Sequence, residues 1–308
     1  MTRIAVYGAG GVGGYFGARL ARAGAEVHFI ARGAHLHALR EHGLKVRSVK
    51  GDFQVQAQAT DDPADIGPCD FVLFCVKSFD TDAAAARLGP LVGAGTAVIS
   101  LQNGIENEDV IARELGLPPL MIALTRIGVA LTAPATIEYS GRGTIVFGEP
   151  DGSESPRARR AAAAFAVAGV PHQFRRDILV AAWEKLAWNA GFNAVTTLTG
   201  STVGDVLAQA GSRTLVVAAM EEVDAVAVGL GIPVRRSRTA RVVDDSVTGL
   251  PDFQTSMLQD LLRGGRLEHD ALNGAVVRAA AHAGVPVPVN RMLLALLSRL
   301  DPAARQPT

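Results

Sequence analysis

The chain has 308 residues, of which 48% are hydrophobic, and its 30 Lys and Arg residues balance its 30 Asp and Glu residues. This length allows two domains with substantial cores, and the balanced charge indicates neither a nucleic-acid partner nor an anionic membrane surface. No apolar run approaches the roughly 18 residues that a membrane span needs, and the short N-terminal apolar segment is unlike a secretory signal. We therefore expect a cytoplasmic protein that binds neither nucleic acid nor membrane.

The first predicted elements are a short apolar strand at residues 4–7 and a helix, joined by a glycine-rich turn with G-x-G-x-x-G spacing. In such a turn the first glycine allows a sharp bend, the second lets the backbone approach a pyrophosphate, and the third lets helix and sheet pack closely. The helix N-terminus offers N–H groups and a positive dipole end to phosphates. The strand before and the helix after favour a dinucleotide site over a simple tight turn. Its candidate residues are Gly8, Gly10, Gly11, Val12 and Gly13.

The second predicted strand, Glu26–Ala31, ends at the position that selects the cofactor. An NAD site usually places Asp or Glu there to bind the ribose 2′-hydroxyl, but this chain has Ala31 followed by Arg32. A guanidinium can bind the 2′-phosphate of NADP, which a carboxylate would repel. We therefore expect NADP(H) as the cofactor, with Arg32 at the 2′-phosphate. The alternative is an arginine that only ends a strand in solvent.

Residues 44–60 alternate between apolar and polar side chains, with a break at Gly51 and Asp52. Alternation of this kind on both sides of a turn predicts a β-hairpin. We therefore expect an antiparallel insertion here rather than another βαβ unit.

Two buried strands are predicted next, at Phe71–Val76 and Thr96–Leu101, and each is followed by a polar residue, Lys77 and Asn103 respectively. Both positions fall at the carboxyl edge of a parallel sheet, where open α/β folds bind ligands. Alone, either residue could be an ordinary strand-end or turn residue. The occurrence of both after successive strands favours a binding site.

Strands separated by glycine turns, then a helix and an edge strand, are predicted in the following stretch: Leu120–Val129, Thr136–Ser140, Thr144–Gly148, Pro156–Ala168 and His172–Arg175. Beyond Asp177 the strand pattern disappears and helical periodicity continues to the end. The sequence therefore predicts an α/β domain at residues 1–176 and a helical domain at residues 177–308.

The first helix of the second domain carries Lys185 and Asn189, which are four residues apart and share one face. Asn193 extends this row if the helix continues through Gly191. A lysine on a surface helix is usually only solvated, but here the polar row is set among large apolar residues. That arrangement is typical of small-molecule sites. The flanking apolar residues are Trp183, Leu186, Trp188 and Phe192.

Two further candidates lie near the C-terminus, and spacing alone assigns neither a role. Ser256 begins a helical pattern, where a hydroxyl can serve as an N-cap or occupy the first turn. Glu268 precedes another helix, where a carboxylate interacts favourably with the helix dipole.

Cys69 and Cys75 are close together near a buried strand and lack metal-ligand spacing, so reduced thiols are expected. His35, His37 and His42 share one predicted helix, where we expect them to be solvated rather than bound to metal. The sequence therefore predicts no metal site.

Taken together, the motifs resemble the ketopantoate reductase (2-dehydropantoate 2-reductase) family, in the family's order and over nearly the whole chain. The last two motifs are far more specific than the glycine loop. The resemblance implies a Rossmann-type N-terminal domain, an all-helical C-terminal domain and an active site between them. It also implies NADPH-dependent reduction of 2-dehydropantoate to (R)-pantoate, a step toward pantothenate and coenzyme A. The matching motifs are GAGGVGGYFGARLARAG, FCVKSFDT, LQNGIEN, WEKLAWNAGFNAVTTLTG and TSMLQDLLRGGRLEHDALNG.

Roles carry over by motif position. Lys185 matches the family's catalytic lysine and Glu268 its catalytic glutamate, while Asn103 matches the asparagine at the nicotinamide end and also serves the substrate. The remaining matches are the substrate-contacting positions Asn189, Asn193 and Ser256, the lysine after the strand, Lys77, and the 2′-phosphate arginine, Arg32.

One departure affects the expected substrate. The family commonly has T-E-I-D around the catalytic glutamate, and this chain has Leu267 and His269 beside Glu268. Two alternatives therefore stay open: an NADP-dependent reductase of another 2-keto or β-hydroxy acid, and a non-catalytic NADP(H)-binding sensor. The expected partner is a small 2-keto acid, and a homodimer is one candidate for the oligomeric state.

Overall fold

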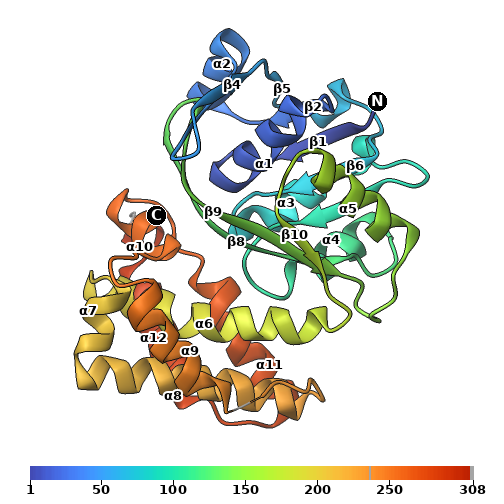
Figure 1. Cartoon of the computed structure of the whole chain (residues 1–308). Coiled ribbons are helices and arrows are strands. Elements are labelled where there is room, and N and C mark those ends of the chain that lie inside the picture. The colour runs from blue at the N-terminus through green and yellow to red at the C-terminus, as the bar shows by residue number, and fades with distance from the viewer. Residues whose placement is uncertain (236, 306–308) are drawn as a thin grey trace. The chain divides into compact units, whose positions relative to one another are not determined.

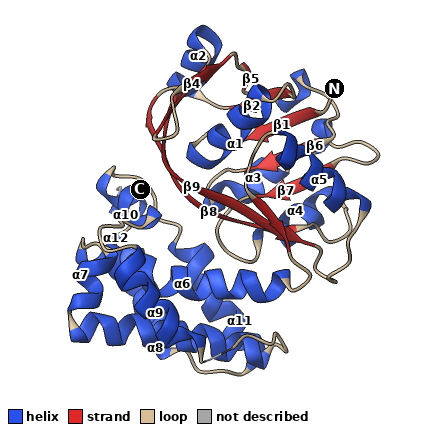
Figure 2. Cartoon of the chain, in the orientation of Figure 1, coloured by secondary structure: helices blue, strands red, loops and turns tan. Residues whose placement is uncertain are grey.

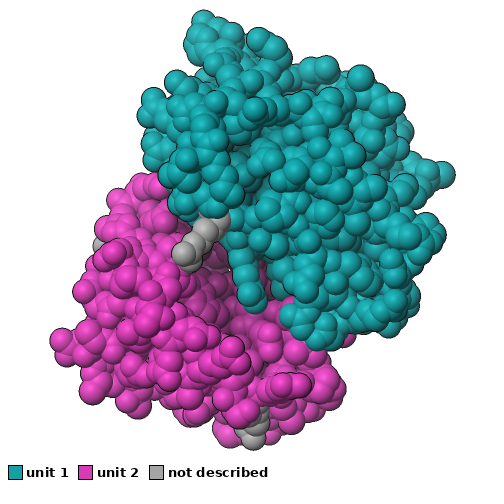
Figure 3. All heavy atoms as spheres, viewed as in Figure 1, with its two compact units in different colours: residues 1–102, 107–178 teal, residues 103–106, 179–308 magenta. Residues whose placement is uncertain are grey.

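The computed structural model of this chain describes residues 1–235 and 237–305. Contacts divide the chain into two compact units, coloured in Figure 3: unit 1 comprises residues 1–102 and 107–178, and unit 2 comprises residues 103–106 and 179–308. Unit 1 contains two sheets with helices, whereas the elements of unit 2 are helical wherever the chain is described (Figure 2). The expected fold, a Rossmann-type α/β domain followed by a helical one, is confirmed.

The first sheet of unit 1 has five parallel strands in the order β5-β2-β1-β6-β7 (Figure 1, with β7 labelled in Figure 2). Its strands β6 and β7 are buried along their whole length, which is why they read as continuous apolar runs. The chain moves outward from β1 in one direction to β2 and β5, and in the other to β6 and β7. In doubly wound sheets, ligands bind outside the carboxyl ends at this switch point. The strands are β1 (Arg3–Tyr7), β2 (Glu26–Ile30), β5 (Gln58–Thr60), β6 (Phe71–Phe74) and β7 (Ala97–Ser100).

The helices of unit 1 pack their apolar faces on these strands. In α1 the buried face includes Tyr15, Phe16 and Leu20, and α5 begins with a capping serine, Ser155, before a proline. The helices are α1 (Gly11–Arg22), α2 (Gly33–His42), α3 (Thr81–Ala85), α4 (Asn107–Leu115) and α5 (Pro156–Val167), with 3₁₀ turns η1 (Pro63–Asp65), η2 (Ser78–Asp80) and η3 (Gly89–Leu91).

The second sheet has the order β10-β9-β3-β4, and β8 pairs with β9. The predicted hairpin is confirmed for β3 and β4, which pair antiparallel with Leu44 opposite Val55. The prediction is wrong for residues 58–60, because β5 leaves the hairpin and joins β2 in parallel in the first sheet. The sheet consists of β3 (Leu44–Ser48), β4 (Phe53–Val55), β8 (Ile122–Ala133), β9 (Thr136–Gly148) and β10 (His172–Phe174).

The prediction of a turn between residues 140 and 144 is also wrong, because β9 continues through this stretch as one strand. Its pairing with β8 shifts between Ile127 opposite Gly143 and Val129 opposite Tyr139. A β-bulge of this kind absorbs extra residues without ending the strand. Gly141, with φ of 91°, supplies the backbone conformation that the irregularity needs.

Unit 2 is built around α6, which runs without interruption through Gly191, as the polar row requires. A Cβ atom at Gly191 would lie 3.0 Å from the Val216 carbonyl oxygen, so glycine permits close packing against α8. No helix in the described part of the chain is long and apolar enough to cross a membrane. The helices are α6 (Ile178–Thr199), α7 (Val203–Ala208), α8 (Ala210–Gly229), α9 (Arg238–Gly249), α10 (Ser256–Leu262), the π-helical turn η4 (Asp270–Gly274), α11 (Ala275–Ala283), α12 (Pro288–Leu300) and the 3₁₀ turn η5 (Pro302–Arg305).

Candidate functional site

The glycine-rich turn connects β1 to α1 at the switch point of the first sheet. Gly8 has φ of 97°, and a Cβ there would lie 2.8 Å from the Val76 nitrogen, so this position needs glycine for the bend. A Cβ at Gly13 would fall 2.2 Å from the Gly8 carbonyl oxygen. At Gly10, by contrast, a Cβ would meet nothing within 4 Å. The first and third glycines are therefore required by packing, whereas the second lies beside open space.

The N-terminus of α1 is left without a capping side chain. Its N-cap residue is Gly10, which makes no side-chain hydrogen bond, and the first turn contains no acidic residue. Ser155 caps α5 and Thr255 caps α10, whereas α2, α8 and α12 lack a capping side chain, as α1 does. The first N–H groups of a helix have no partner within the helix, and together with the dipole they attract anions. These residues therefore fit a pyrophosphate group.

Arg32 lies directly after β2, where it is the exposed N-cap residue of α2. The first turn of α2 has no acidic residue, and Ala31 uses its N–H to bond the Thr60 carbonyl of β5. Asp61, at the end of β5, lies 3.9 Å from Arg40. Arg32 is thus a cationic side chain at the end of the strand, a position at which a guanidinium can bind a phosphate group.

Lys77 follows the carboxyl end of β6, where it is half-buried at the start of η2. Strands β2 and β6 flank β1 on opposite sides. Arg32 and Lys77 therefore follow the two strands that border the strand carrying Gly8. This placement agrees with the ligand crevice of a doubly wound sheet.

A buried polar network at the ends of β6 and β7 was not found by sequence reasoning. Gln102 donates from Nε2 to the Val76 carbonyl at 3.0 Å and to Thr81 Oγ1 at 2.8 Å. Its Oε1 accepts a hydrogen bond from Ser100 Oγ at 3.1 Å. This network fixes the end of β7, from which the chain continues directly to Asn103. Its only sequence indication is a glutamine placed immediately before that asparagine.

The polar row on α6 has the geometry that the sequence predicts. Lys185 is half-buried, and Asn189 and Asn193 are buried at successive turns of the same helix face. Trp188 stacks on Phe192 with ring centroids 4.8 Å apart, which gives the row a rigid aromatic neighbour. The side chain of Asn189 is 6% exposed and forms no hydrogen bond with another described residue. Buried amides normally have partners, so Asn189 is available to a ligand.

The N-terminus of α10 adjoins this row. Asn193 accepts at Oδ1 a 3.5 Å hydrogen bond from the Met257 N–H. Thr255 is the N-cap, and its hydroxyl lies 2.7 Å from the Thr196 hydroxyl of α6. Ser256 is therefore an exposed first-turn residue rather than the cap, and it lies beside the residue that contacts Asn193.

Asn103 and Glu268 are brought together in unit 2. The Asn103 amide donates from Nδ2 to the Glu268 carboxylate at 3.4 Å, and Glu268 is buried. The segment carrying Asn103 is held by Arg278, which bonds both Glu106 carboxylate oxygens, at 3.0 and 2.6 Å. Arg278 also bonds Asp270 Oδ1 at 2.8 Å. The hydrogen bonds that Arg278 donates to the Glu106 carboxylate raise the pKa of Arg278, so its charge is retained at every working pH.

The two residues that differ from the family pattern have roles outside the Glu268 contact. Leu267 is buried in the apolar core of unit 2. The His269 Nδ1 atom lies 3.5 Å from a carboxylate oxygen of Asp301. Leu267 therefore fills the core of unit 2 and His269 lies beside Asp301, and neither forms the contact between Asn103 and Glu268.

The expectation that all three histidines of α2 are solvated is wrong for His35. Its Nε2 atom lies 2.8 Å from the Ala9 carbonyl oxygen, and its Nδ1 accepts a 2.9 Å hydrogen bond from the Ala135 N–H. His37 and His42 are exposed as expected. The His35 side chain points inward because α2 starts next to the glycine turn, a relationship that helix periodicity alone does not reveal.

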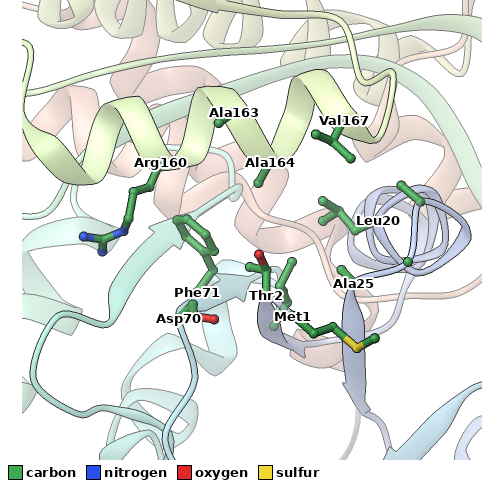
Figure 4. A pocket seen from close by; sticks show the side chains of 13 residues that line it. Met1, Thr2, Leu20, Ala25, Asp70, Phe71, Arg160, Ala163, Ala164 and Val167 are labelled. Atoms are coloured by element: carbon green, nitrogen blue, oxygen red, sulfur yellow. The ribbon is translucent and has the colours of Figure 1, made fainter.

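A surface pocket of about 490 Å³ lies at the other end of the first sheet. Figure 4 shows Ala164 and Val167 of α5 on one side of it and Thr2 and Phe71 on the other. Thr2 precedes β1, and Phe71 begins β6, so this pocket is at the amino ends of the strands. Parallel sheets bind dinucleotides at their carboxyl ends, so this pocket is separate from the candidate cofactor site.

Comparison with known proteins agrees with this arrangement. Residues 4–152 match the family described as ketopantoate reductase PanE/ApbA, and residues 177–301 match its C-terminal domain. A 2-dehydropantoate 2-reductase from Mesorhizobium japonicum is 31% identical, with 97% of each chain covered. A crystal structure of a PanE/ApbA family ketopantoate reductase from Ralstonia eutropha JMP134 is 35% identical, with a TM-score of 0.91 over 99% of this chain and 100% of that one.

A D-mandelate dehydrogenase structure with NADH and anilino(oxo)acetate has a TM-score of 0.92 at 21% identity, over 99% of this chain and 100% of that one, and so shares the fold. The two family matches together span most of the sequence, and the relatives are covered over nearly their full length. The chain therefore belongs to the ketopantoate reductase PanE/ApbA family, a family of oxidoreductases.

Proposed function

We propose that this protein is an NADPH-dependent 2-dehydropantoate 2-reductase, which forms (R)-pantoate for pantothenate and coenzyme A biosynthesis. The observation that carries the proposal is the contact between Asn103 and Glu268 at 3.4 Å, which joins two residues of separate family motifs. Residues 1–176 bind the dinucleotide in this proposal. Residues 177–308 supply the catalytic lysine and glutamate.

The cofactor assignment rests on the charge and shape of unit 1. An uncapped α1 N-terminus with open space at Gly10 suits the pyrophosphate, and Arg32 suits the 2′-phosphate of NADP(H). Gly11, Val12 and Lys77 complete the binding residues. When bound, the dihydronicotinamide supplies a hydride for the 2-keto carbon.

Lys185 is the proposed proton donor. Reduction of a ketone places negative charge on its oxygen, and an ammonium group can stabilise that charge and then give up its proton. Lys185 is half-buried on α6 beside buried asparagines, so its charge acts in a region from which much of the water is excluded.

Glu268 and the neutral polar residues position the reactants. A buried carboxylate 3.4 Å from the Asn103 amide can orient the lysine or accept a hydrogen bond from the product hydroxyl. The free amide of Asn189 can donate to the substrate carboxylate. Asn193 of α6 accepts from the Met257 N–H, and Ser256 precedes Met257 in the first turn of α10. In this proposal both residues supply further donors for the substrate carboxylate and hydroxyl.

A second candidate is reduction of another 2-keto acid. The D-mandelate dehydrogenase that shares this fold is solved as a ternary structure with NADH and anilino(oxo)acetate, a compound with an aromatic group on its oxo-acid part. Leu267 and His269 depart from the family pattern on either side of Glu268 in the sequence, and this departure is the reason for testing the alternative, although their contacts lie in the core and at Asp301.

Steady-state NADPH oxidation distinguishes the two. Ketopantoate, phenylglyoxylate and 2-oxoisovalerate are assayed side by side, each with NADPH and with NADH. The proposal expects the highest kcat/KM for ketopantoate with NADPH. A higher kcat/KM for phenylglyoxylate would replace it with the second candidate, and cofactor binding without turnover of any acid would indicate a sensor.

A further inference from the structure

The His35 ring connects two segments that border the glycine-rich turn. Its Nε2 is 2.8 Å from the carbonyl oxygen of Ala9, the residue between the first two glycines of the motif. Its Nδ1 is 2.9 Å from the N–H of Ala135, in the turn between β8 and β9. We call these two hydrogen bonds the His35 bridge. Both lie entirely within unit 1.

The partners of the ring determine where its proton resides. The Ala135 N–H can only donate, so Nδ1 must carry a lone pair, and the Ala9 carbonyl can only accept, so Nε2 must carry the hydrogen. The bridge therefore requires the neutral imidazole with its proton on Nε2. Protonation of Nδ1 would place two donors against each other and break the bond to Ala135.

The turn at Ala135 depends on this contact. Ala135 has φ of 54°, and it is the one non-glycine residue with positive φ in the described chain. A left-handed alanine costs of order 1 kcal/mol and persists where its surroundings fix it. Here Ala135 is buried, its N–H bonds His35, and its carbonyl accepts from the Lys45 N–H at 2.9 Å. The backbone strain therefore lies at a position that the bridge holds.

The glycine turn also lies against the second sheet on this side. A Cβ at Gly11 would lie 3.4 Å from the Val129 carbonyl oxygen of β8, and one at Gly14 would lie 2.9 Å from the Ile137 side chain of β9. The strands on both sides of the Ala135 turn thus contact the start of α1. A change in that turn would be transmitted to the phosphate-binding backbone through short, rigid contacts.

We propose that His35 is a positioning residue for the cofactor phosphates: neutral His35 holds the glycine turn in its binding conformation, and protonated His35 releases it and weakens dinucleotide binding. This inference rests on the proposed NADP(H) function.

The surroundings of the ring favour its neutral form. Burial lowers the pKa of His35 below its usual value of 6.5, while the bond to the Ala9 carbonyl opposes that shift. His35 is also the third residue of α2, where the helix dipole disfavours a positive charge. The glycine turn and residues 134–135 carry no ionisable side chain. The packed elements carry further charged or titratable groups: Arg32, His37, Arg40, Glu41 and His42 at α2, Tyr15, Arg19 and Arg22 on α1, Lys45 and Arg47 on β3, Arg126 on β8, and Glu138 and Tyr139 on β9.

The direction of the pH effect follows from this lowered pKa. The folded protein binds the proton less readily than the unfolded chain. The His35 bridge therefore stabilises the glycine turn fully above pH 6.5, and this stabilisation is lost as the pH falls through the lowered pKa of His35. Dinucleotide affinity should therefore be constant around neutral pH and decline on the acid side.

The test measures the Kd of NADPH from neutral pH down to about pH 5, in the range where histidines titrate. His35→Gln keeps a donor that can reach the Ala9 carbonyl but cannot titrate, His35→Asn keeps an acceptor for the Ala135 N–H, and His35→Ala removes both bonds. His37→Gln is the matched control, because His37 is exposed on the same helix. Thermal melts of each variant confirm that it is folded at the pH of the measurement.

We expect acidification to weaken wild-type and His37→Gln binding about tenfold more than His35→Gln binding, the scale of one lost hydrogen bond. The 2′-phosphate of NADPH also titrates at about pH 6, but this effect is common to all the variants and cancels in the comparison. His35→Ala should raise the Kd at every pH and raise the KM for NADPH more than it lowers kcat. A His35→Ala variant with the wild-type Kd and pH profile would overturn the proposal.

Ring-nitrogen NMR shifts of the cofactor-free protein separate this proposal from the proposed function. A neutral His35 with its proton on Nε2 supports the bridge, whereas a proton on Nδ1 at neutral pH overturns it. If the wild-type protein binds no NADPH at any pH while its ring has the expected tautomer, the cofactor assignment fails, and the positioning role fails with it although the bridge exists.

Discussion

The amide of Asn103 lies 3.4 Å from the carboxylate of Glu268, although 165 residues separate them in the chain. Asn103 follows β7 of unit 1, yet residues 103–106 make their contacts with the helical unit. Within that segment Glu106 is bonded through both carboxylate oxygens to Arg278. These two hydrogen bonds, which we call the Arg278 fork, therefore help to hold the segment in unit 2.

Loss of this fork should impair catalysis more than it weakens binding of the cofactor. Arg278→Met and Glu106→Gln are each expected to lower kcat/KM for the keto acid about tenfold, because a misplaced reacting group costs rate even far from the chemistry. The double variant should be no worse than Arg278→Met, since both changes remove the bonds between Arg278 and Glu106 and only Arg278→Met also removes the bonds to Asp270. Steady-state kinetics measure kcat/KM for the keto acid, and NADPH titrations measure binding of the cofactor.

Arg213→Met is the control for that series. Arg213 is exposed to a similar degree and bonds Asp244 at 2.6 Å on the outer helices of unit 2. The Arg213→Met variant should therefore have an unchanged kcat/KM for the keto acid. Additive effects of Arg278→Met and Glu106→Gln would contradict the role given to the fork.

Removal of the Lys185 ammonium should cost between about a hundredfold and ten-thousandfold in turnover, the contribution typical of a proton donor. Lys185→Ala leaves the glycine turn and Arg32 untouched, so its Kd for NADPH should stay near the wild-type value. Single-turnover kinetics and a fluorescence titration measure the two quantities. Near-normal turnover of Lys185→Ala would show that another group donates the proton.

The cofactor preference should depend on Arg32. Arg32→Ala is expected to raise the KM for NADPH at least tenfold and to leave the KM for NADH nearly unchanged, because only NADPH has the 2′-phosphate. Arg47→Ala is the control, since Arg47 is an exposed arginine of the second sheet, 3.8 Å from Glu138. An equal effect of Arg32→Ala on both cofactors would place Arg32 outside the 2′-phosphate site.

Two glycine variants should separate folding from binding. Gly13→Ala places a Cβ 2.2 Å from the Gly8 carbonyl oxygen and 2.9 Å from the Cys75 Cβ, so it should destabilise unit 1 by roughly 1–3 kcal/mol. Gly10→Ala meets nothing within 4 Å and should keep the wild-type melting temperature.

NADPH binding should nevertheless weaken in Gly10→Ala, because the new methyl group occupies space beside the proposed pyrophosphate position. Thermal denaturation and NADPH titration of the two variants measure these effects. Wild-type affinity in Gly10→Ala would indicate that the pyrophosphate does not approach this glycine.

The sequence by itself determined the features that depend on local periodicity and backbone conformation. The bend at Gly8 needs a positive φ, and the row from Lys185 to Asn193 follows from the helical repeat once α6 passes through Gly191. The buried parallel strands and the change to an all-helical second unit were predictable for the same reason, because burial on both faces and a 3.6-residue repeat leave distinct patterns.

The tertiary structure alone decided which distant segments meet. Alternation in residues 44–60 predicted strands, but whether β5 pairs with its neighbour or with β2 depends on the whole sheet, since strand pairing is a long-range choice. The bulge that keeps β9 continuous depends in the same way on its partner β8. The contacts of His35 with Ala9 and Ala135, and of Asn103 with Glu268, join residues whose separation leaves no periodic pattern. Such contacts become visible only when the packed elements bring the chain together.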